Sequence, residues 1–246
     1  MNLLDCLTTP TISNVWGKSI PNKQGALYYR DNGADILAVA HLDSVLWSSP
    51  RKKGKIVRCP QLDDRLGVWV ILNVLPRLGV NVDVLLTDCE EVGRSTADFF
   101  HPEKQYNWMV EFDRKGTDVV MYDYDCEEYA DMLWEANFSP AFGSWSDICH
   151  LDHLDIAGFN IGTGYHNEHT HGCYADLNDT LSQAELFADF WRDHRKELLP
   201  APIDVVEDEY AYEDDDGWWA IEQRARYYGY DNTNDFILEG GLQLLG

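Results

Sequence analysis

The sequence predicts one α/β domain in which buried strands alternate with helices. Three runs, at residues 34–40, 82–86 and 106–112, are mostly hydrophobic, and each is followed by histidine or acidic residues. Such runs are typical of the central strands of a sheet that helices cover on both faces. The length of 246 residues suits one such domain with a substantial core and a small appendage.

The first half of the chain is predicted to contribute three strands and a basic loop. Residues 25–30 are a candidate edge strand, and residues 34–40 form the first central strand. Residues 48–55 combine proline, glycine and four cations, which is typical of a loop. A solvated loop is the simpler interpretation, and a loop that holds a substrate carboxylate is the alternative. Residues 82–86 form the next buried strand.

A buried helix is predicted between this loop and the strand that follows it. Residues 68–75 are almost entirely apolar, and either Asp63 or Asp64 is placed to cap the amino terminus of the helix. Pro76 and Gly79 are expected to stop it. A strand is the competing prediction for the same run. Because paired aspartates favour a helix start, one carboxylate can cap the helix while the other points at a site.

The second half of the chain repeats the alternation of strand and helix. Residues 106–112 are predicted to form a strand, and residues 126–138 have the apolar spacing of an amphipathic helix. Residues 155–162 are predicted to form a last short strand. A final helix is expected over residues 183–199, because apolar side chains there follow one stripe.

The composition changes near residue 203. Residues 204–246 contain runs of Asp and Glu together with many Tyr and Trp residues. The acidic runs alone favour disorder, whereas the aromatic side chains favour docking against another surface. The chain is therefore divided into a domain at residues 1–203 and an acidic, aromatic-rich appendage at residues 204–246.

Charge and composition exclude several classes of function. The net charge of −24 disfavours nucleic acids and anionic membranes as partners, because polyanions are repelled. No apolar run approaches the ~20 residues of a membrane span, and the amino terminus lacks a basic start before an apolar core. The six cysteines are scattered and are interpreted as free thiols. We expect a cytoplasmic protein that is a monomer or a small homo-oligomer.

Two adjacent carboxylates, Glu90 and Glu91, follow the predicted strand 82–86. The carboxyl ends of strands are where open α/β sheets bind their ligands. Because adjacent residues of an extended chain point to opposite sides, the two carboxylates could serve different partners. Glutamate pairs are also common on solvated helix ends, so a functional interpretation requires further polar residues at neighbouring strand ends.

Further polar residues do follow the neighbouring strands. His41 and Asp43 come after strand 34–40 and lie on one side of the chain, so the imidazole could bind a cation while the carboxylate orients it. A core histidine satisfied by a neighbouring acid is the structural alternative. Asp113 comes directly after strand 106–112. Three strand ends therefore carry possible metal ligands.

A histidine-rich loop follows the predicted strand 155–162. His166, His169 and His171 lie within six residues of one another. Core packing does not explain such a density of histidine, and a metal-binding loop is the better interpretation. The strand-end and loop residues together supply two histidines and several carboxylates, which is the inventory of a two-metal hydrolytic site.

Five short motifs in this order resemble the co-catalytic dizinc exopeptidase superfamily, which includes aminopeptidases, tripeptidases and aminoacylases. They are A-H-L-D-S, L-D-D-R-L-G, T-D-C-E-E-V-G, E-F-D-R-K-G and N-E-H-T. The resemblance implies a three-layer sandwich with a central mixed, mostly parallel β-sheet flanked by helices. The stretch between Asp113 and His169 is filled by a predicted helix and strand, which leaves no room for an inserted lid or dimerisation domain. The Ser146-Asp147 stretch also favours the single-domain aminopeptidase-like branch.

The resemblance implies five metal ligands. They are His41, Asp63, Glu91, Asp113 and His169. His41 and Asp113 would bind one Zn²⁺ ion, Glu91 and His169 would bind the other, and Asp63 would bridge the two. Co²⁺ or Mn²⁺ could substitute for zinc.

Two further residues would have catalytic roles. Asp43 would orient His41, and Glu90 would be the general base that takes a proton from a zinc-bridging water and delivers it to the leaving amine. The implied activity is aminopeptidase-like cleavage of a peptide bond at the end of a small peptide. Hydrolysis of small N-acylated compounds, such as N-acyl amino acids, is the alternative. A non-catalytic module that retains the metals is the third possibility.

For two of the implied metal ligands, a neighbouring residue of the same type remains an alternative. In L-D-D-R-L-G the family pattern places the ligand at the first aspartate, which favours Asp63 over Asp64. The pattern N-x-H followed by an acid and an aromatic residue aligns His169, although Cys173 stands where the acid is expected. A different alignment of the same loop favours His166.

Overall fold

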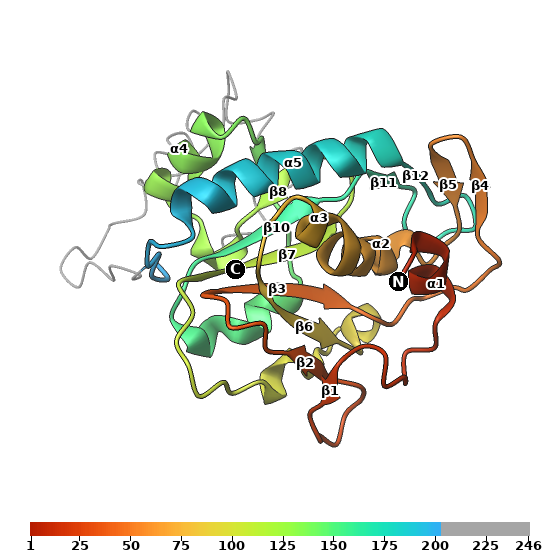
Figure 1. Ribbon diagram of the computed structural model, residues 1–246, viewed down its shortest axis with the longest axis horizontal. Helices are drawn as coiled ribbons and strands as arrows, with labels where there is room; N and C mark the ends of the chain where they lie inside the picture. Colours follow the sequence, from red (N-terminus) through yellow and green to blue (C-terminus); the bar gives the residue numbers. More distant parts are fainter. Residues whose placement is uncertain (203–246) are drawn as a thin grey trace, which may run out of the picture.

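An eight-stranded sheet forms the centre of the computed structural model, which describes residues 1–202 (Figure 1). The strand order is β1-β2-β6-β3-β7-β10-β8-β9. The four central strands are parallel to one another: β6 (Asp83–Thr87), β3 (Ile36–His41), β7 (Trp108–Arg114) and β10 (Gly158–Gly162). The predicted boundary at residue 203 and the predicted appendage lie outside the described residues.

Shorter strands complete the two edges of this sheet. β2 (Tyr28–Arg30) pairs antiparallel with β6, and β1 (Lys18–Ser19) pairs antiparallel with β2. At the other edge, β8 (Val119–Val120) pairs antiparallel with β10 and parallel with β9 (Pro140–Ala141). The strand predicted near residues 25–30 is therefore real, but β1 is the outer strand at that edge. The sheet is mixed and mostly parallel, as predicted.

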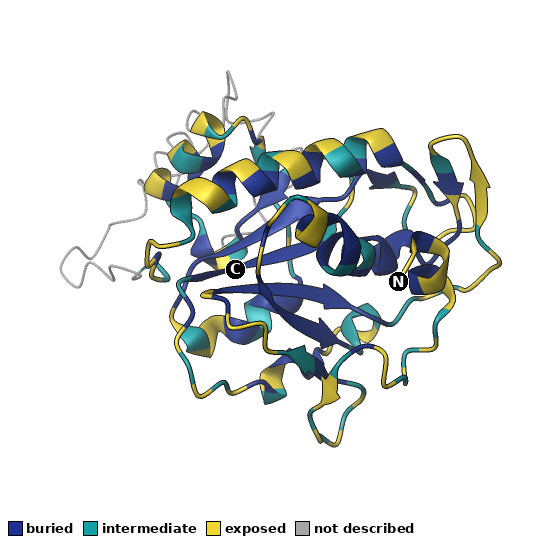
Figure 2. Ribbon diagram, viewed as in Figure 1, coloured by how far each residue is buried: buried dark blue, intermediate teal, exposed yellow. Residues whose placement is uncertain are grey.

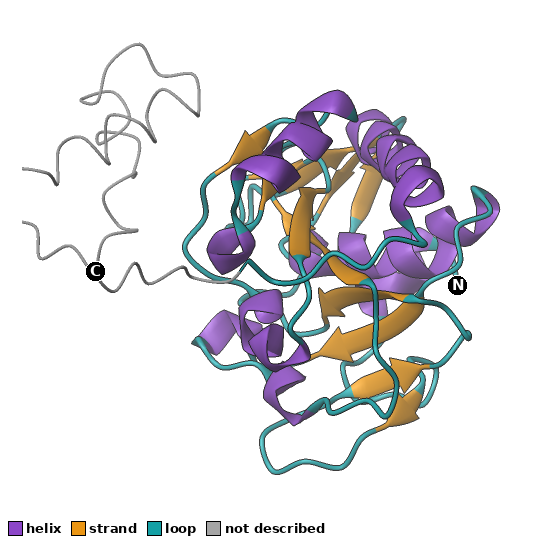
Figure 3. Cartoon of the chain, turned by 90° about the vertical axis from the view of Figure 1, so that its left-hand side faces the viewer, coloured by secondary structure: helices purple, strands orange, loops and turns teal. Residues whose placement is uncertain are grey.

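Helices cover both faces of the sheet, which gives three layers (Figure 3). α2 (Leu62–Trp69) packs against β3 and β7, while α5 (Leu177–His194) packs against β10 on the same side. The 3-10 helices η3 (Thr96–Phe99) and η5 (Asp147–Leu154) contact each other and lie against β6, β3 and β7. Coverage of both faces explains why the central strands are apolar without alternation.

The central strands form the largest buried core of the described domain (Figure 2). Trp108 of β7 packs edge to face against Phe159 of β10 and Phe187 and Phe190 of α5, with ring centroids 5.5 to 6.1 Å apart. Edge-to-face pairs contribute about 0.5–1.5 kcal/mol each beyond the burial of their area. This aromatic cluster fixes α5 against the sheet.

The segment predicted to be a basic loop is a hairpin. β4 (Arg51–Lys53) and β5 (Ile56–Arg58) pair antiparallel and join β12 (Tyr174–Asp176) and β11 (Tyr165–His166) in a second sheet of order β11-β12-β5-β4. The prediction of a loop was wrong, and so was the prediction that the strand near residues 155–162 is the last. All three side chains of β4 are exposed, so the strand lacks an alternating hydrophobic pattern and is held by backbone pairing.

The buried helix after this hairpin is confirmed, and so is its end at Gly79, which is left-handed (φ 77°) and follows the last helical turn, but Pro76 does not stop the helix. It begins at Leu62, passes through a π-helical turn, η1 (Val70–Val74), and continues as α3 (Leu75–Arg77) through Pro76. Asp63 and Asp64 have non-helical backbone angles, and Asp64 Oδ1 accepts a hydrogen bond from the N–H of Gly67 (3.2 Å), so Asp64 caps the regular part of the helix, as one of the two aspartates was predicted to do. The Asp63–Asp64 peptide bond is cis.

The remaining helices differ from prediction mainly at their ends. α4 (Glu127–Glu135) lies within the predicted amphipathic segment. α5 begins six residues before the predicted start, because Asp176 accepts a hydrogen bond from the N–H of Asn178 and caps the helix there. The short helix α1 (Leu3–Thr8) and η5 were not predicted. Within residues 1–202, no helix is both long and apolar enough to span a bilayer.

Candidate metal centre

The predicted site residues meet at one end of the main sheet, where its central parallel strands finish. β3, β6 and β7 are parallel neighbours, so their carboxyl ends lie together. His41 is the last residue of β3, and Asp113 lies near the end of β7. Glu90 and Glu91 begin the 3-10 turn η2 (Glu90–Val92), just after β6. Parallel pairing therefore converts three strand ends, distant in sequence, into one cluster.

Two candidate ligands reach this end of the sheet from segments outside it. Asp63 lies at the start of α2, which packs over β3 and β7. His169 lies in the turn between β11 and β12 and has a left-handed backbone conformation (φ 58°). The small sheet thus presents the histidine loop to the ends of the large one.

His41 is the centre of the first group. Its Nε2 atom lies 3.1 Å from Asp113 Oδ1 and 3.6 Å from Asp63 Oδ1. Its Nδ1 atom lies 3.4 Å from Asp43 Oδ1, as expected for a carboxylate that orients an imidazole. His41 is fully buried, and no aligned hydrogen bond reaches Nδ1.

His169 is the centre of the second group. Its Nε2 atom lies 3.1 Å from Asp63 Oδ2 and 3.0 Å from Glu91 Oε2. The side chain is 55% exposed, so this group faces solvent, whereas the His41 group is closed. Asp63 is therefore shared, with Oδ1 directed at His41 and Oδ2 at His169.

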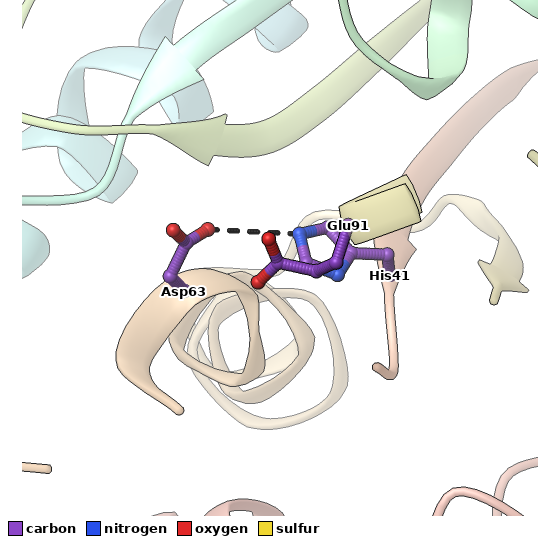
Figure 4. A group of neighbouring side chains, drawn as sticks. All are labelled: His41, Asp63 and Glu91. Carbon is purple, nitrogen blue, oxygen red and sulfur yellow. Dashed lines mark ion pairs between the residues drawn. The ribbon is translucent and has the colours of Figure 1, made fainter. Parts of the chain in front are cut away.

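The geometry is compatible with bound metal ions. Ligand atoms of His41, Asp63 and Glu91 lie within 4.8 Å of one another (Figure 4). Those of His41, Asp64 and Asp113 meet the same limit. Imidazole nitrogen and carboxylate oxygen are the donors that Zn²⁺, Mn²⁺ and Co²⁺ use in catalytic sites.

Asp43 connects two segments of the site. Its carboxylate oxygens accept hydrogen bonds from the backbone N–H groups of Glu90 (3.4 Å) and Glu91 (3.2 Å). Cys89, just before this turn, is left-handed (φ 70°) and so redirects the chain after β6. Asp43 thus fixes the glutamate pair as well as facing His41.

The charge of the cluster is strongly unbalanced. Eight carboxylates from the described chain lie in or beside it: Asp43, Asp63, Asp64, Glu90, Glu91, Glu111, Asp113 and Asp147. Among residues 1–202, no Lys or Arg forms an ion pair with any of them. Buried carboxylates require compensating positive charge, so the donor set fits divalent cations.

The pKa directions reflect this crowding. Burial raises the pKa of Glu90 to about 9 and that of Asp113 to about 7, with His41 acting in the opposite direction in both cases. The hydrogen bond with Asp63 raises the pKa of His169 to about 9. Burial lowers the pKa of His41, but the adjacent Asp113 carboxylate reverses this effect and raises it well above its usual value. Protonated imidazoles thus supply positive charge that the carboxylates attract.

The structure distinguishes the alternatives at two positions. Asp64 is fully buried, and its oxygens accept backbone hydrogen bonds from His41 (3.1 Å) and Gly67 (3.2 Å). These bonds occupy Asp64 with the backbone, whereas Asp63 faces both histidines. His166 stacks on Tyr174, with ring centroids 5.3 Å apart, and within residues 1–202 it forms no ion pair with a carboxylate of the cluster. These positions favour Asp63 and His169 as ligands.

Sequence reasoning missed several residues of the site. Ser146 donates a hydrogen bond to Glu111 (2.5 Å) and lies 3.3 Å from Asp113 Oδ2. The position of Glu111 could have been predicted from the sequence, because it lies two residues before Asp113 on β7 and so its side chain is on the same face of the strand. The hydroxyl of Tyr165 reaches Asp63 from the second sheet, and no local pattern predicts that contact.

Comparisons with known proteins bear on the fold. No family model matches the sequence, and no curated protein matches it significantly. An aminopeptidase from the archaeon Desulfurococcus kamchatkensis is similar in structure, with a TM-score of 0.53 and 14% identity over 76% of this chain and 87% of that chain. The TET1 peptidase of Pyrococcus horikoshii gives 0.52 and 13% over 76% and 98% of the two chains.

A third similar structure is a tripeptidase from Staphylococcus aureus, with a TM-score of 0.51 and 11% identity over 68% of this chain and 84% of that chain. The predicted resemblance is therefore confirmed at the level of the fold, which this chain shares with solved aminopeptidases and a tripeptidase.

Proposed function

We propose that this protein is a metal-dependent hydrolase that cleaves a peptide bond at the end of a small peptide, in the manner of an aminopeptidase. The observation that carries the proposal is the sharing of Asp63, since one of its carboxylate oxygens faces His41 and the other faces His169. Glu90 Oε2 lies beside this pair, 4.0 Å from His41 Nε2. Two ligand groups that share a carboxylate, with a further acid next to them, match the requirements of two-metal hydrolysis.

Each ligand group has the donors for one cation. His41 and Asp113 would hold one ion, Glu91 and His169 the other, and Asp63 would contribute to both. When bound, Zn²⁺, Co²⁺ or Mn²⁺ ions supply a more acidic water and polarise the carbonyl of the substrate. The surrounding protein keeps these donors in place, since Asp43 and Asp64 bond to the backbone of the segments that carry them.

Glu90 is the proposed general base. It receives a proton from the attacking water and returns it to the leaving amine. Its carboxylate pairs with no Lys or Arg in the described chain, and the backbone N–H of the same residue is held by Asp43. Burial raises the pKa of Glu90 to about 9, and nearby cations act in the opposite direction and favour the ionised form.

The charge of the site favours a peptide over an N-acyl amino acid. A free α-ammonium group is attracted to a cluster rich in carboxylates, whereas a free carboxylate requires a cation partner. The buried Arg65 lies nearby, but it donates to the backbone carbonyls of Leu42, Cys6 and Thr9. The similarity in fold to aminopeptidases and a tripeptidase supports the same choice. Deacylation of N-acylated compounds is the second candidate.

Metal analysis combined with an activity assay on Glu90→Gln tests the proposal. We expect wild type to contain stoichiometric metal and to hydrolyse aminoacyl-p-nitroanilides. The variant should keep its metal and lose roughly 100-fold or more in kcat, which is the usual contribution of a general base. Glu103→Gln, an exposed glutamate remote from the cluster, is the matched control.

Three outcomes would contradict or redirect the proposal. Wild type without bound metal, or equal activity in wild type and Glu90→Gln, would sink the mechanism. Activity on N-acetyl amino acids without activity on anilides or peptides would select the deacylase. Bound metal with no hydrolysis of either class of substrate would select the non-catalytic module.

A further inference from the structure

Tyr165 brings a hydroxyl group from an apolar environment to the acidic cluster. The residue is 3% exposed and belongs to the second buried cluster, beneath the small sheet, with Leu62, Leu66 and Val57. Its hydroxyl oxygen lies 2.6 Å from the backbone carbonyl oxygen of Asp113 and 3.1 Å from Asp63 Oδ1. The ring is therefore core, and the hydroxyl is the one part of the side chain that faces the site.

The presence of a hydroxyl group at this buried position requires an explanation. Within the described chain, three side chains lie close to the Asp63 carboxylate: His41, His169 and Tyr165. Tyr165 is the one uncharged donor among them. A phenylalanine would fill the same apolar space without burying a polar atom. Because a buried hydroxyl is costly unless it is bonded, the two acceptors explain why the polar side chain is tolerated there.

The position of this bond on Asp63 matters. Oδ1 shares the single proton of the Tyr165 hydroxyl with the Asp113 carbonyl oxygen and faces His41, whereas Oδ2 faces His169. Rotation of an aspartate carboxylate about its last side-chain torsion is weakly restricted by the side chain itself. A donor fixed on Oδ1 therefore sets the direction of Oδ2 as well, and so sets how the carboxylate is divided between the two groups.

The main chain of Tyr165 connects the same parts of the site. Its carbonyl accepts a hydrogen bond from the N–H of Gly116 (2.9 Å), just after β7, and the residue pairs with Ala175 in β12. The loop between β11 and β12 carries His169. One residue thus links the histidine loop, the end of β7 and the shared carboxylate.

We propose that Tyr165 is a positioning residue that holds Asp63 in the orientation needed to contact two cations at once. The inference rests on the proposed function, because it assigns a role toward the metals of that site. Tyr165 itself contacts neither the substrate nor the reacting atoms. Its contribution is to the geometry of the carboxylate that the two ligand groups share.

Zinc affinity of Tyr165→Phe tests the inference without relying on activity. Zinc is titrated against a chromophoric chelator, and we expect the affinity for at least one of the two ions to fall by ~10–100-fold, the usual effect of losing a bond that orients a ligand. In the same variant, kcat for an aminoacyl-p-nitroanilide should fall while KM changes little, because the hydroxyl does not touch the substrate.

Tyr106→Phe is the matched control. Tyr106 is also a buried tyrosine, and its hydroxyl donates to the carboxylate of Asp83 at 2.8 Å, at the opposite end of the sheet. The substitution removes the same kind of bond without touching the metal centre. We expect its zinc affinity to equal that of wild type.

The outcomes separate this inference from the proposed function. Wild-type zinc affinity in Tyr165→Phe would overturn the positioning role while the proposed function stands. Equal losses of zinc affinity in both variants, in proportion to their unfolding temperatures, would show a general loss of stability and would also overturn it. A wild type that binds no zinc would overturn the proposed function and the inference together.

Discussion

Glu90 and Glu91 are adjacent in sequence but face different partners. Glu91 Oε2 lies 3.0 Å from His169, and Glu91 Oε1 accepts a hydrogen bond from the N–H of Val45 (3.2 Å). Glu90 instead points toward His41, at 4.0 Å. The chain leaves β6 through a left-handed residue, Cys89, and a 3-10 turn, which separates the two side chains. Their proposed roles are therefore opposite, one as a ligand and the other as a base.

The two glutamates should respond differently to the same substitution. Glu91→Gln removes a charged donor from the more exposed ligand group, and we expect zinc affinity to fall ~10-fold or more. Glu90→Gln should leave zinc affinity within about threefold, because a residue that binds no metal loses no coordination. Competition titration with a chelator measures both. Equal zinc affinity in the two variants would contradict the proposal that Glu91 is a metal ligand and Glu90 is not.

At the scale of elements, Asp83 anchors the start of β6. The carboxylate is buried and accepts hydrogen bonds from the backbone N–H groups of Asn32 (2.8 Å) and Ala34 (3.0 Å) and from the hydroxyl of Tyr29 (2.6 Å). Lys104 forms an ion pair with it. Burial raises the pKa of Asp83, but these donors outweigh burial and lower the pKa below its usual value. β2, β3 and β6 are thereby joined at the end of the sheet opposite the metal centre.

This anchor predicts a pH-dependent contribution to stability. Because the folded-state pKa of Asp83 is below its unfolded value of ~3.9, the stabilisation is complete above that value and is lost as the pH falls through the folded-state pKa. Asp83→Asn should lower the free energy of unfolding by about 1–3 kcal/mol at pH 7, since it leaves buried donors unpaired.

Urea unfolding at pH 7 and pH 3 measures this contribution. The difference between wild type and Asp83→Asn should be smaller at pH 3 than at pH 7. Asp131→Asn, an exposed position on α4, is the control and should change stability little at either pH. A difference that grows on acidification would contradict the assigned direction of the pKa.

At the scale of the whole molecule, the candidate metal centre lies where the two sheets meet. The main sheet supplies His41, the glutamate pair and Asp113, whereas the small sheet presents His169. Eight carboxylates within this junction repel one another when no cation compensates them. Occupation by metal should therefore stabilise the described domain, not only complete its chemistry.

Metal removal tests this coupling. With free metal at ~100 times the dissociation constant, binding adds about 2.7 kcal/mol to stability, which corresponds to roughly 5–10 °C in Tm for a domain of this size. We expect Tm, measured by calorimetry, to fall by this order after dialysis against EDTA and to recover when Zn²⁺ or Mn²⁺ is restored. An unchanged Tm through both steps would contradict a structural contribution from the metals.

Local patterns were sufficient for the main strands and for the residues proposed to carry the chemistry. β3, β6 and β7 were predictable because a strand buried on both faces is a continuous apolar run, and its end is marked by the first polar residues. The ends of these apolar runs are where the candidate site residues lie, namely His41, Glu90, Glu91 and Asp113. Parallel pairing of the strands then brings them together, as an α/β sheet requires.

Local patterns failed where the stabilising interaction comes from elsewhere in the chain. The hairpin β4–β5 has no alternating side chains and depends on backbone pairing with β12. Asp64 caps α2 through the N–H of Gly67, but it also accepts the N–H of His41, 23 positions away. A short sequence window around the hairpin does not contain β12, and one around Asp64 does not contain His41.

The sequence by itself determined the α/β class, the central strands and the set of candidate ligands, because these depend on burial patterns and on residue types within short segments. Only the tertiary structure decided that Asp63 directs one oxygen at each histidine, that Asp64 accepts the backbone N–H of His41, and that the Tyr165 hydroxyl lies beside the shared carboxylate. These depend on distances between segments far apart in sequence, such as Tyr165 and Asp63, which are 102 positions apart, and such distances are fixed by packing of the two sheets.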